Sequence, residues 1–255
     1  MLLRAENLTK RFGGIAALEA VSLGLQAGAV HAVIGPNGAG KTTLLNVLSG
    51  IYRPDAGRIF LENDEITSRA PHEFAQAGIS RTFQNLQVFF NMTVLENVMV
   101  GRWLHERCGL AAALLRLPAL SRAERACREQ AAALLEAVGI QRWAQARADS
   151  VPYGALKRLE IARALAAEPR LLLLDEPAAG LNATETQEID ELIRRIAARG
   201  ITVVLVEHNM KLVMGVAQHV VVLDYGRKLV EGKPAAVSRD PRVIEAYLGA
   251  EACSR

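Results

Sequence analysis

Gly35-Pro36-Asn37-Gly38-Ala39-Gly40-Lys41-Thr42-Thr43 fits the pattern G-x-x-x-x-G-K-[ST] at every fixed position. The apolar residues 30–34 before it predict a strand, and the spacing of the apolar residues at 44, 45, 47 and 48 predicts a helix after it. Glycines let backbone amides curve around an anion, and the helix directs its positive N-terminal end at the same anion. Lys41 can then reach the β- and γ-phosphates, and the Thr42 hydroxyl can ligate Mg²⁺. The stretch therefore predicts a binding site for a nucleoside triphosphate.

Composition indicates an ordinary globular protein with a sizeable core. The chain has 255 residues, of which 51% are hydrophobic and 22% charged. Its apolar runs are far shorter than the roughly 20 residues of a membrane span, and its N-terminus lacks the apolar core of a signal peptide. The three cysteines have no metal or redox spacing, which indicates reduced thiols in a cytosolic protein. A net charge of +3 is too small to indicate nucleic acid, and we expect no nucleic-acid partner.

The order of predicted elements indicates an α/β core with an inserted helical lobe. Residues 92–149 are rich in Ala, Leu, Arg and Glu with helical periodicity, whereas residues 1–91 and 150–255 carry the strand-like runs. Within the lobe, Pro118 precedes a Ser121-x-x-Glu124 capping box, which predicts a break between two helices. Short strands with a turn at Gly13-Gly14 open the chain. We expect a single nucleotide-binding domain over residues 1–255.

Three predicted strands end in polar residues that suit phosphate chemistry. The first leads into Gly35, the second (171–174) into Asp175-Glu176, and the third (201–206) into Glu207-His208. Ligands of open α/β sheets lie beyond the carboxyl ends of the strands, so we expect these residues at one cleft. A helix between the last two strands is predicted to begin after Asn182, with Glu185 in its first turn, and to end at Gly200.

Asp175 and Glu176 suit a division of labour in phosphoryl transfer. Neighbouring side chains of an extended segment point in different directions, so one carboxylate can serve Mg²⁺ while the other polarises water. The alternative is that both acids cap the following helix. The phosphate loop upstream favours the catalytic interpretation.

Taken together, these motifs resemble the nucleotide-binding subunit of ATP-binding-cassette transporters over nearly the whole chain, from Leu8 to Gly249. The resemblance implies a phosphate-loop NTPase core with an N-terminal antiparallel β subdomain and an inserted α-helical subdomain. Within that superfamily, several stretches look like the subunits of bacterial branched-chain amino-acid importers. They are Arg11 to Gly14, Arg81 to Gln84, Arg158 to Arg163, Ala178 to Asn182 and Ala246 to Gly249.

The resemblance implies ATP and Mg²⁺ as ligands and assigns roles to matching residues. Phe12 matches the aromatic residue that stacks on adenine, and Gln84 the glutamine that contacts Mg²⁺ or the attacking water. Glu176 matches the general base and His208 the residue that holds the γ-phosphate. Together with Lys41 of the phosphate loop, they form the implied catalytic set. The implied nucleotide-binding set is Phe12, Gly35, Pro36, Asn37, Gly38, Ala39, Gly40, Lys41, Thr42, Thr43 and Gln84, and the implied metal ligands are Thr42, Gln84 and Asp175.

A fifth motif departs from the superfamily's usual Leu-Ser-Gly-Gly-Gln. Residues 151–155 read Val-Pro-Tyr-Gly-Ala, so Pro152 replaces the serine and Ala155 the glutamine. In relatives this segment closes over the γ-phosphate bound by a partner subunit. Tyr153 and Gly154 are therefore expected to contact the partner's nucleotide, with the following helix N-terminus favouring an anion. Asn182 likewise replaces the acid that is usual after the catalytic glutamate.

The resemblance favours an ATPase subunit of a membrane importer, with separate permease subunits. It implies a second nucleotide-binding subunit (the same chain or a paralogue), two membrane permeases, indirect dependence on a periplasmic solute-binding protein, and a peripheral position on the cytoplasmic face of the inner membrane. Permeases are expected to dock near Gln84 and residues 89–100, although core packing also explains Val88-Phe89-Phe90. Alternatives are an importer of another amide or urea, a lipid or polysaccharide exporter, or a soluble ATPase acting on DNA or ribosomes.

Overall fold

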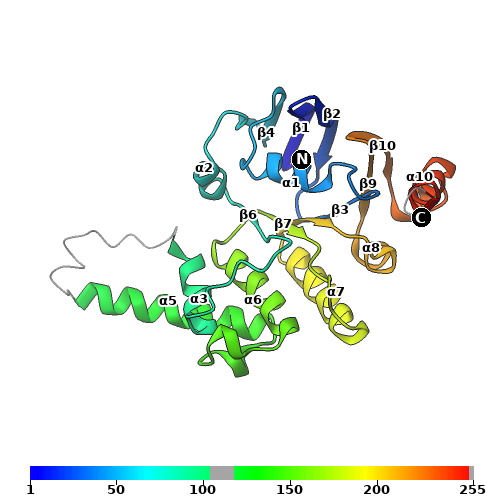
Figure 1. The fold of residues 1–255 in the computed structure, drawn as a ribbon. Helices are drawn as coiled ribbons and strands as arrows, with labels where there is room; N and C mark the ends of the chain where they lie inside the picture. Colours follow the sequence, from blue (N-terminus) through cyan, green and yellow to red (C-terminus); the bar gives the residue numbers. More distant parts are fainter. Residues whose placement is uncertain (104–117, 253–255) are drawn as a thin grey trace. The chain divides into compact units, whose positions relative to one another are not determined.

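The computed structural model describes residues 1–103 and 118–252, which form two compact units (Figure 1). The first unit comprises Met1–Arg81 and Arg170–Arg255, and the second comprises Thr82–Pro169. Residues 92–149, expected as an inserted lobe, lie within the second unit. Among the helices of the described ranges, none is long and apolar enough to cross a membrane.

A largely parallel six-stranded sheet forms the centre of the first unit as far as it is described. Its strand order is β10-β9-β3-β8-β7-β6, in which β10 alone runs antiparallel to its neighbour. The three strands predicted to end in polar residues are confirmed as β3, β7 and β8, which lie side by side and run parallel. The bounds are β3 Val30–Ile34, β6 Ile79–Arg81, β7 Leu171–Asp175, β8 Thr202–Val206, β9 His219–Asp224 and β10 Arg227–Gly232.

The expected N-terminal antiparallel sheet is present, with strand order β2-β1-β4-β5. Gly13 and Gly14 form the turn between β1 and β2, as predicted. These strands have 10 and 11 residues and are longer than the short strands expected, because bulges keep their pairing going past irregular positions. The bounds are β1 Leu3–Phe12, β2 Ile15–Leu25, β4 Ala56–Leu61 and β5 Asp64–Glu65.

Side chains on the two faces of the six-stranded sheet enter two different hydrophobic clusters. Because successive residues of a strand point to opposite faces, Val221 and Leu223 of β9 join the cluster that also holds the antiparallel sheet. Val220 and Val222 of the same strand join the other cluster. All residues of β7 and β8 are buried, which explains why both strands read as continuous apolar runs.

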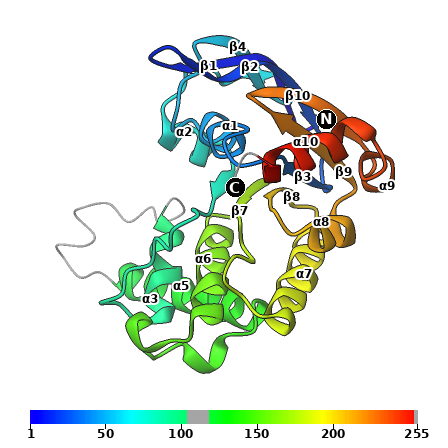
Figure 2. The same ribbon diagram turned by 45° about the vertical axis from the view of Figure 1, so that its right-hand side comes forward.

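Helices pack on both faces of this sheet, and Figure 2 shows α8, α9 and α10 gathered beside β9 and β10. Helix α1 buries Leu44, Leu45, Val47 and Leu48 in the cluster shared with the antiparallel sheet. The predicted start of α7 is confirmed: the Asn182 side chain accepts from the Glu185 N–H, and Glu185 accepts from the Asn182 N–H, both at 3.0 Å. The helix bounds are α1 Lys41–Leu48, α2 Pro71–Gln76, α7 Ala183–Ala198, α8 Met210–Val216, α9 Pro234–Val237 and α10 Pro241–Ala252.

The second unit is helical in its described part. Helices α3 and α6 approach closely at Gly101, where a Cβ would lie 2.3 Å from the Arg163 carbonyl oxygen. The capping box predicted at Ser121 is wrong, because Ser121 lies inside α5, whose described residues run from Pro118 to Ala137. Residues 104–117 of the predicted helical lobe lie outside the described residues. The bounds are α3 Val94–Gly101, α5 Pro118–Ala137, α6 Tyr153–Ala166, and the 3₁₀ turns η2 Gln141–Trp143 and η3 Ala148–Ser150.

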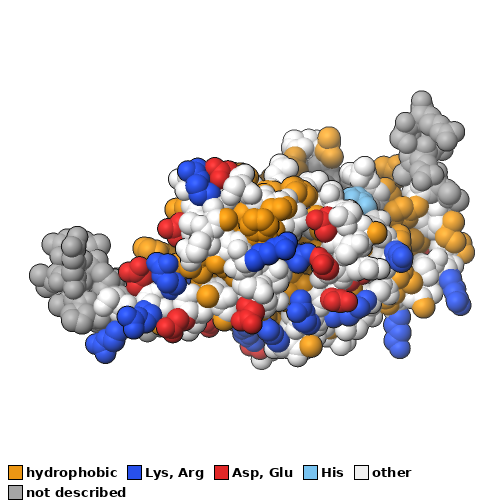
Figure 3. Space-filling view, turned by 90° about the horizontal axis from the view of Figure 1, so that it is seen from below, with side chains coloured by type: hydrophobic (Ala, Val, Ile, Leu, Met, Phe, Trp, Pro, Cys, Tyr) orange, Lys and Arg blue, Asp and Glu red, His pale blue; other side chains and the backbone are white. Residues whose placement is uncertain are grey.

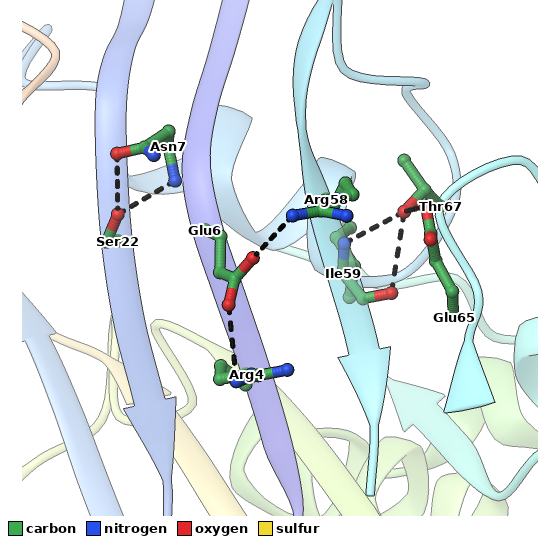
Figure 4. A network of polar contacts seen from close by, with 8 residues as sticks. All are labelled: Arg4, Glu6, Asn7, Ser22, Arg58, Ile59, Glu65 and Thr67. Carbon is green, nitrogen blue, oxygen red and sulfur yellow. Dashed lines mark hydrogen bonds and ion pairs between the residues drawn. The ribbon is translucent and has the colours of Figure 1, made fainter. Parts of the chain in front are cut away.

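Polar contacts also cross the outer surface of the antiparallel sheet. Glu6 on β1 forms an ion pair with Arg4 at 3.3 Å and accepts from Arg58 on β4 at 3.4 Å, and Asn7 contacts Ser22 on β2 (Figure 4). Such exposed ion pairs contribute little to stability.

Charged side chains of both signs are interspersed on the face drawn in Figure 3, with apolar patches between them.

Candidate functional site

The phosphate loop follows β3 and depends on glycine at two crowded positions. Gly35 has a φ of +151°, and a Cβ there would lie 2.1 Å from the Leu223 carbonyl oxygen. Gly40 has a φ of +99°, and a Cβ there would lie 2.4 Å from the Ala17 carbonyl oxygen. Any other residue would therefore force the neighbouring backbone to move. Gly38, with a φ of +80°, faces open space within 4 Å, so the loop stays accessible there.

Lys41 begins α1 and is buried at the foot of the loop. Its ammonium Nζ donates to the carbonyl oxygens of Gly35 and Pro36, both at 2.8 Å. Burial lowers the pKa of Lys41, and the carboxylates of Glu176 and Asp175 act in the opposite direction. A buried cation at the positive end of a helix dipole favours an anion at this place, which fits a phosphate group.

Asp175, the last residue of β7, is paired with a buried arginine. Its Oδ2 lies 3.1 Å from Nη2 of Arg81, and the two side chains are 1% and 6% exposed. The Arg81 guanidinium also donates to the side chains of Asn46 and Ser49 on α1 and its C-terminal end. Burial lowers the pKa of Arg81, and Asp175 opposes that effect. The pair therefore fixes the ends of β6, β7 and α1 relative to one another.

Glu176 and His208 meet beyond the carboxyl ends of β7 and β8. The Nε2 of His208 lies 2.7 Å from Oε1 of Glu176. Glu176 has a φ of +48°, which is strained for a residue with a side chain, and its N–H donates to the Val206 carbonyl oxygen at 2.9 Å. The three strand ends predicted to converge do come together: Lys41 binds the Gly35 carbonyl oxygen and is influenced by the charges of Glu176 and Asp175, and Glu176 contacts His208.

Glu207, which the sequence places in this site without a role, organises the backbone around it. Its carboxylate is buried and accepts from the N–H groups of Ala178 at 3.0 Å, His208 at 3.1 Å and Asn209 at 3.4 Å. Burial raises the pKa of Glu207, and these N–H groups lower it in part. The carboxylate thus ties the loop after Glu176 to the loop that carries His208.

Phe12 ends β1 and presents its ring at the surface of the first unit. The side chain is 45% exposed and meets Tyr52 edge-on, with ring centroids 5.2 Å apart. Asp55 stabilises the same end of β1, because its carboxylate accepts from the Lys10 ammonium at 2.9 Å and from the Arg11 N–H at 2.6 Å. An exposed aromatic on an anchored strand end is suited to stacking on a planar ligand.

Gln84, Tyr153 and Gly154 belong to the second unit. Gln84 follows β6, and its carbonyl oxygen accepts from Nζ of Lys157 at 3.5 Å. Tyr153 is the first residue of α6 and is 45% exposed, whereas Gly154 is buried. Pro152 precedes the helix, and its carbonyl oxygen accepts from the N–H groups of Ala155 and Leu156 at 3.0 and 3.1 Å. The contact of Tyr153 and Gly154 with a partner's nucleotide stays a prediction.

Sequence reasoning missed three buried polar side chains around the segment that carries Gln84. They are Asn97 on α3 and Lys157 and Glu160 on α6. The sequence shows only a polar residue on an otherwise apolar helix face, and this pattern does not indicate which group the residue binds. Their partners are backbone groups of residues 84–89, which lie 73 positions away in the sequence for Lys157 and Glu160 and 8 positions away for Asn97.

Comparison with known proteins supports the resemblance seen in the motifs. The family described as ABC transporter matches residues 18–179, and the family described as branched-chain amino acid ATP-binding cassette transporter matches residues 227–253. The chain is 44% identical over 249 residues to the high-affinity branched-chain amino acid transport ATP-binding protein BraF of Pseudomonas aeruginosa, with 97% of this chain and 98% of BraF covered. It is 42% identical, with the same coverage, to LivG of Escherichia coli.

Solved structures give the same assignment. The ADP conformation of an ATP-binding cassette of an ABC transporter has a TM-score of 0.84 and 34% identity, covering 97% of this chain and 98% of that chain. A dimeric cassette in a post-hydrolysis state, bound to ADP and Pi, has a TM-score of 0.78 and 25% identity, covering 91% and 99%. The chain therefore belongs to the ABC transporter family, as one of its ATP-hydrolysing cassettes.

Proposed function

We propose that this chain is the ATP-hydrolysing subunit of an importer of branched-chain amino acids. The observation that carries the substrate class is the match of residues 227–253 to the family described as branched-chain amino acid ATP-binding cassette transporter. The high-affinity branched-chain amino acid transport proteins BraF and LivG, which match over 97% of this chain, support it. The site at the carboxyl ends of β3, β7 and β8 supports the hydrolytic activity.

Residues 35–43 would hold the triphosphate, with the Lys41 ammonium against the β- and γ-phosphates. The glycines with positive φ and the N-terminus of α1, which has no side-chain cap, would supply backbone N–H groups for the phosphate oxygens. Lys41 would exchange its two carbonyl contacts for phosphate oxygens, which are stronger acceptors for an ammonium group. Phe12 would stack on the adenine ring.

Mg²⁺ would be held by oxygen ligands from Thr42, Asp175 and Gln84. Hydroxyl, carboxylate and amide oxygens are the donors that this hard cation prefers, so the residues fit the ion. When bound, the ion neutralises charge on the β- and γ-phosphate oxygens. Arg81 holds Asp175 in place through Oδ2. Gln84 lies in the second unit, and its part in the site is a prediction.

Glu176 would act as the general base on the attacking water. His208 contacts Oε1 of Glu176 at 2.7 Å and therefore limits the orientations that the carboxylate can take. The strained backbone at Glu176 and the network around Glu207 hold this arrangement before substrate arrives. A base fixed in advance needs little reorganisation when the water attacks.

A functional transporter would contain a second cassette, the same chain or a paralogue, and two membrane permeases. Tyr153 and Gly154 of one cassette would close over the nucleotide of the other, and the dimeric solved relative supports such pairing. The permeases would dock near Gln84 and residues 89–100, where Phe89 and Phe90 are 43% and 46% exposed. The assembly would place this chain peripherally on the cytoplasmic face of the inner membrane, with a periplasmic solute-binding protein on the other side.

The test is uptake in proteoliposomes that contain this chain, its permeases and the matching solute-binding protein. We expect ATP-dependent accumulation of radiolabelled leucine, isoleucine or valine, and no accumulation with Lys41→Ala. Uptake of short amides or urea in place of these amino acids would overturn the substrate class and keep the importer. ATP-driven release of a lipid without uptake would overturn the importer itself.

A further inference from the structure

The chain between β6 and α3 forms backbone hydrogen bonds with side chains of α3 and α6. Residues 82–92 are all described and form neither helix nor strand. Buried N–H and C=O groups of such a stretch need partners outside any backbone ladder. The residues that supply these partners therefore decide which conformation the stretch adopts.

Two helices of the second unit, α3 and α6, supply these partners. On α3, the fully buried Asn97 accepts from the Phe89 N–H at 2.9 Å and donates to the Phe89 carbonyl oxygen at 3.0 Å. On α6, Oε1 of Glu160 accepts from the Gln87 N–H at 3.1 Å, and Nζ of Lys157 donates to the Gln84 carbonyl oxygen at 3.5 Å. Glu160 and Lys157 are 3% and 2% exposed.

The side chains from α6 lie on one face of the helix. Residues 157, 160 and 163 are spaced by three, so they stand above one another along the helix. The guanidinium carbon of Arg163 lies 5.6 Å from the centroid of the Phe89 ring, so Arg163 also lies against this segment. The face extends back toward the helix start at Tyr153 and Gly154, which is about 9 Å from Glu160 along the axis.

Burying a carboxylate and an ammonium here costs free energy that an apolar pair would not cost. Glu and Lys are rarely buried without specific partners. Burial raises the pKa of Glu160, while the Gln87 N–H and the charges of Lys157 and Arg163 lower it in part. These charged groups bind the backbone of one particular segment, and that segment bears the exposed rings of Phe89 and Phe90.

We infer that Glu160, assisted by Lys157, is a positioning residue that joins residues 84–89 to α6. A protein contact on Phe89 and Phe90 is thereby carried through Gln87 and Glu160 to the start of α6 at Tyr153 and Gly154. This inference rests on the proposed function, because the contact in question is that of the permease. It assigns the coupling to contacts between side chains of α6 and the backbone of residues 84–89.

The first test measures the contact itself and needs no permease. Amide hydrogen exchange is followed in the purified chain for Glu160→Ala and for Glu136→Ala, an exposed glutamate on α5 of the same unit. We expect exchange at Gln87 and its neighbours to accelerate about tenfold in Glu160→Ala and to stay unchanged in Glu136→Ala. Equal exchange in both variants would overturn the inference while leaving the proposed function intact.

The second test measures coupling in the reconstituted transporter. We expect permease-stimulated ATP turnover to fall about tenfold in Glu160→Ala, within the range typical of coupling residues, with ATP affinity of the isolated chain unchanged. Glu160→Gln, which keeps an oxygen for the Gln87 N–H, should recover most of the stimulation. Full stimulation in Glu160→Ala would overturn the inference.

A folding failure of Glu160→Ala and a failure of the proposed function can each be told apart from an error in the inference. If Glu160→Ala does not fold, Lys157→Met against Lys157→Arg provides the same comparison, because only Lys157→Arg keeps a donor for the Gln84 carbonyl oxygen. If wild-type turnover does not respond to the permeases, the proposed function fails and the coupling role fails with it. The exchange measurement separates that case from an error in the contact alone.

Discussion

Buried polar groups occur both at the carboxyl edge of the parallel sheet and around residues 84–89, but they are held in different ways. At the sheet edge, strands that pair through their own backbones set the positions, and Arg81 and Asp175 pair side chain to side chain. Around residues 84–89, no strand ladder exists, and Asn97 and Glu160 bind the backbone directly. Strand pairing therefore holds the first region in place, whereas the second region depends on contacts from a few side chains.

The largest effect is expected from Glu176→Gln at the sheet edge. Removing the base should lower ATP turnover by about 10²- to 10⁴-fold, while ATP binding persists and an ATP-bound dimer accumulates. Steady-state hydrolysis and size-exclusion chromatography with ATP check this result. Glu191→Gln, an exposed residue of α7, is the matched control. Wild-type turnover in Glu176→Gln would remove Glu176 as the base.

Arg81→Met tests whether the buried ion pair is needed for the sheet edge to form. Leaving the Asp175 carboxylate buried without its cation should lower the free energy of unfolding by about 3–5 kcal/mol. Arg170→Met, which removes the exposed pair with Glu62, should cost less than about 1 kcal/mol. Urea unfolding measures both. Equal losses would contradict the importance of burial at this pair.

Asn97→Ala probes the second region in the same way. It leaves the N–H and carbonyl of Phe89 without their side-chain partner, which should cost about 1–3 kcal/mol. Asn182→Ala, which removes an exposed helix cap, should cost about 1 kcal/mol. If Asn97→Ala is no more destabilising than the cap variant, the backbone of residues 84–89 does not depend on this side chain.

The smallest effect is expected from pH acting on His31 in β3. His31 is buried, accepts from the Gln26 N–H at 2.9 Å and faces the His219 ring at 5.8 Å, and burial lowers its pKa below the ordinary 6.5. The unfolded chain therefore binds the proton more readily, so this contribution to stability is full above pH 6.5 and is lost as the pH falls towards the folded pKa.

His31→Gln should retain an acceptor for the Gln26 N–H while removing the titration. Its free energy of unfolding should fall less steeply between pH 7 and pH 5 than that of the wild type. Urea unfolding across this range measures the difference in slope. Parallel slopes would show that His31 does not contribute to the pH dependence.

The sequence predicted local features well because short-range patterns encode them. The glycines and Lys41 of the phosphate loop, the apolar strand 171–174 and the Asn182–Glu185 capping box all depend on residues that are near one another in the chain. Ser121 shows the limit of such patterns, since it matches a capping box but lies inside α5. Local spacing cannot tell whether a capping pattern stands at the start of a helix or within it.

Contacts between distant residues were decided by the tertiary structure alone. Arg81 reaches Asp175 because parallel pairing places β6 beside β7, and Glu160 reaches Gln87 because α6 lies against an irregular segment. Neither partner choice leaves a periodic signal, since each involves single residues more than 70 positions apart. The sequence by itself therefore determined the nucleotide chemistry, because one loop and its flanking elements carry it. Only the packed fold determined which buried charges hold that chemistry in place.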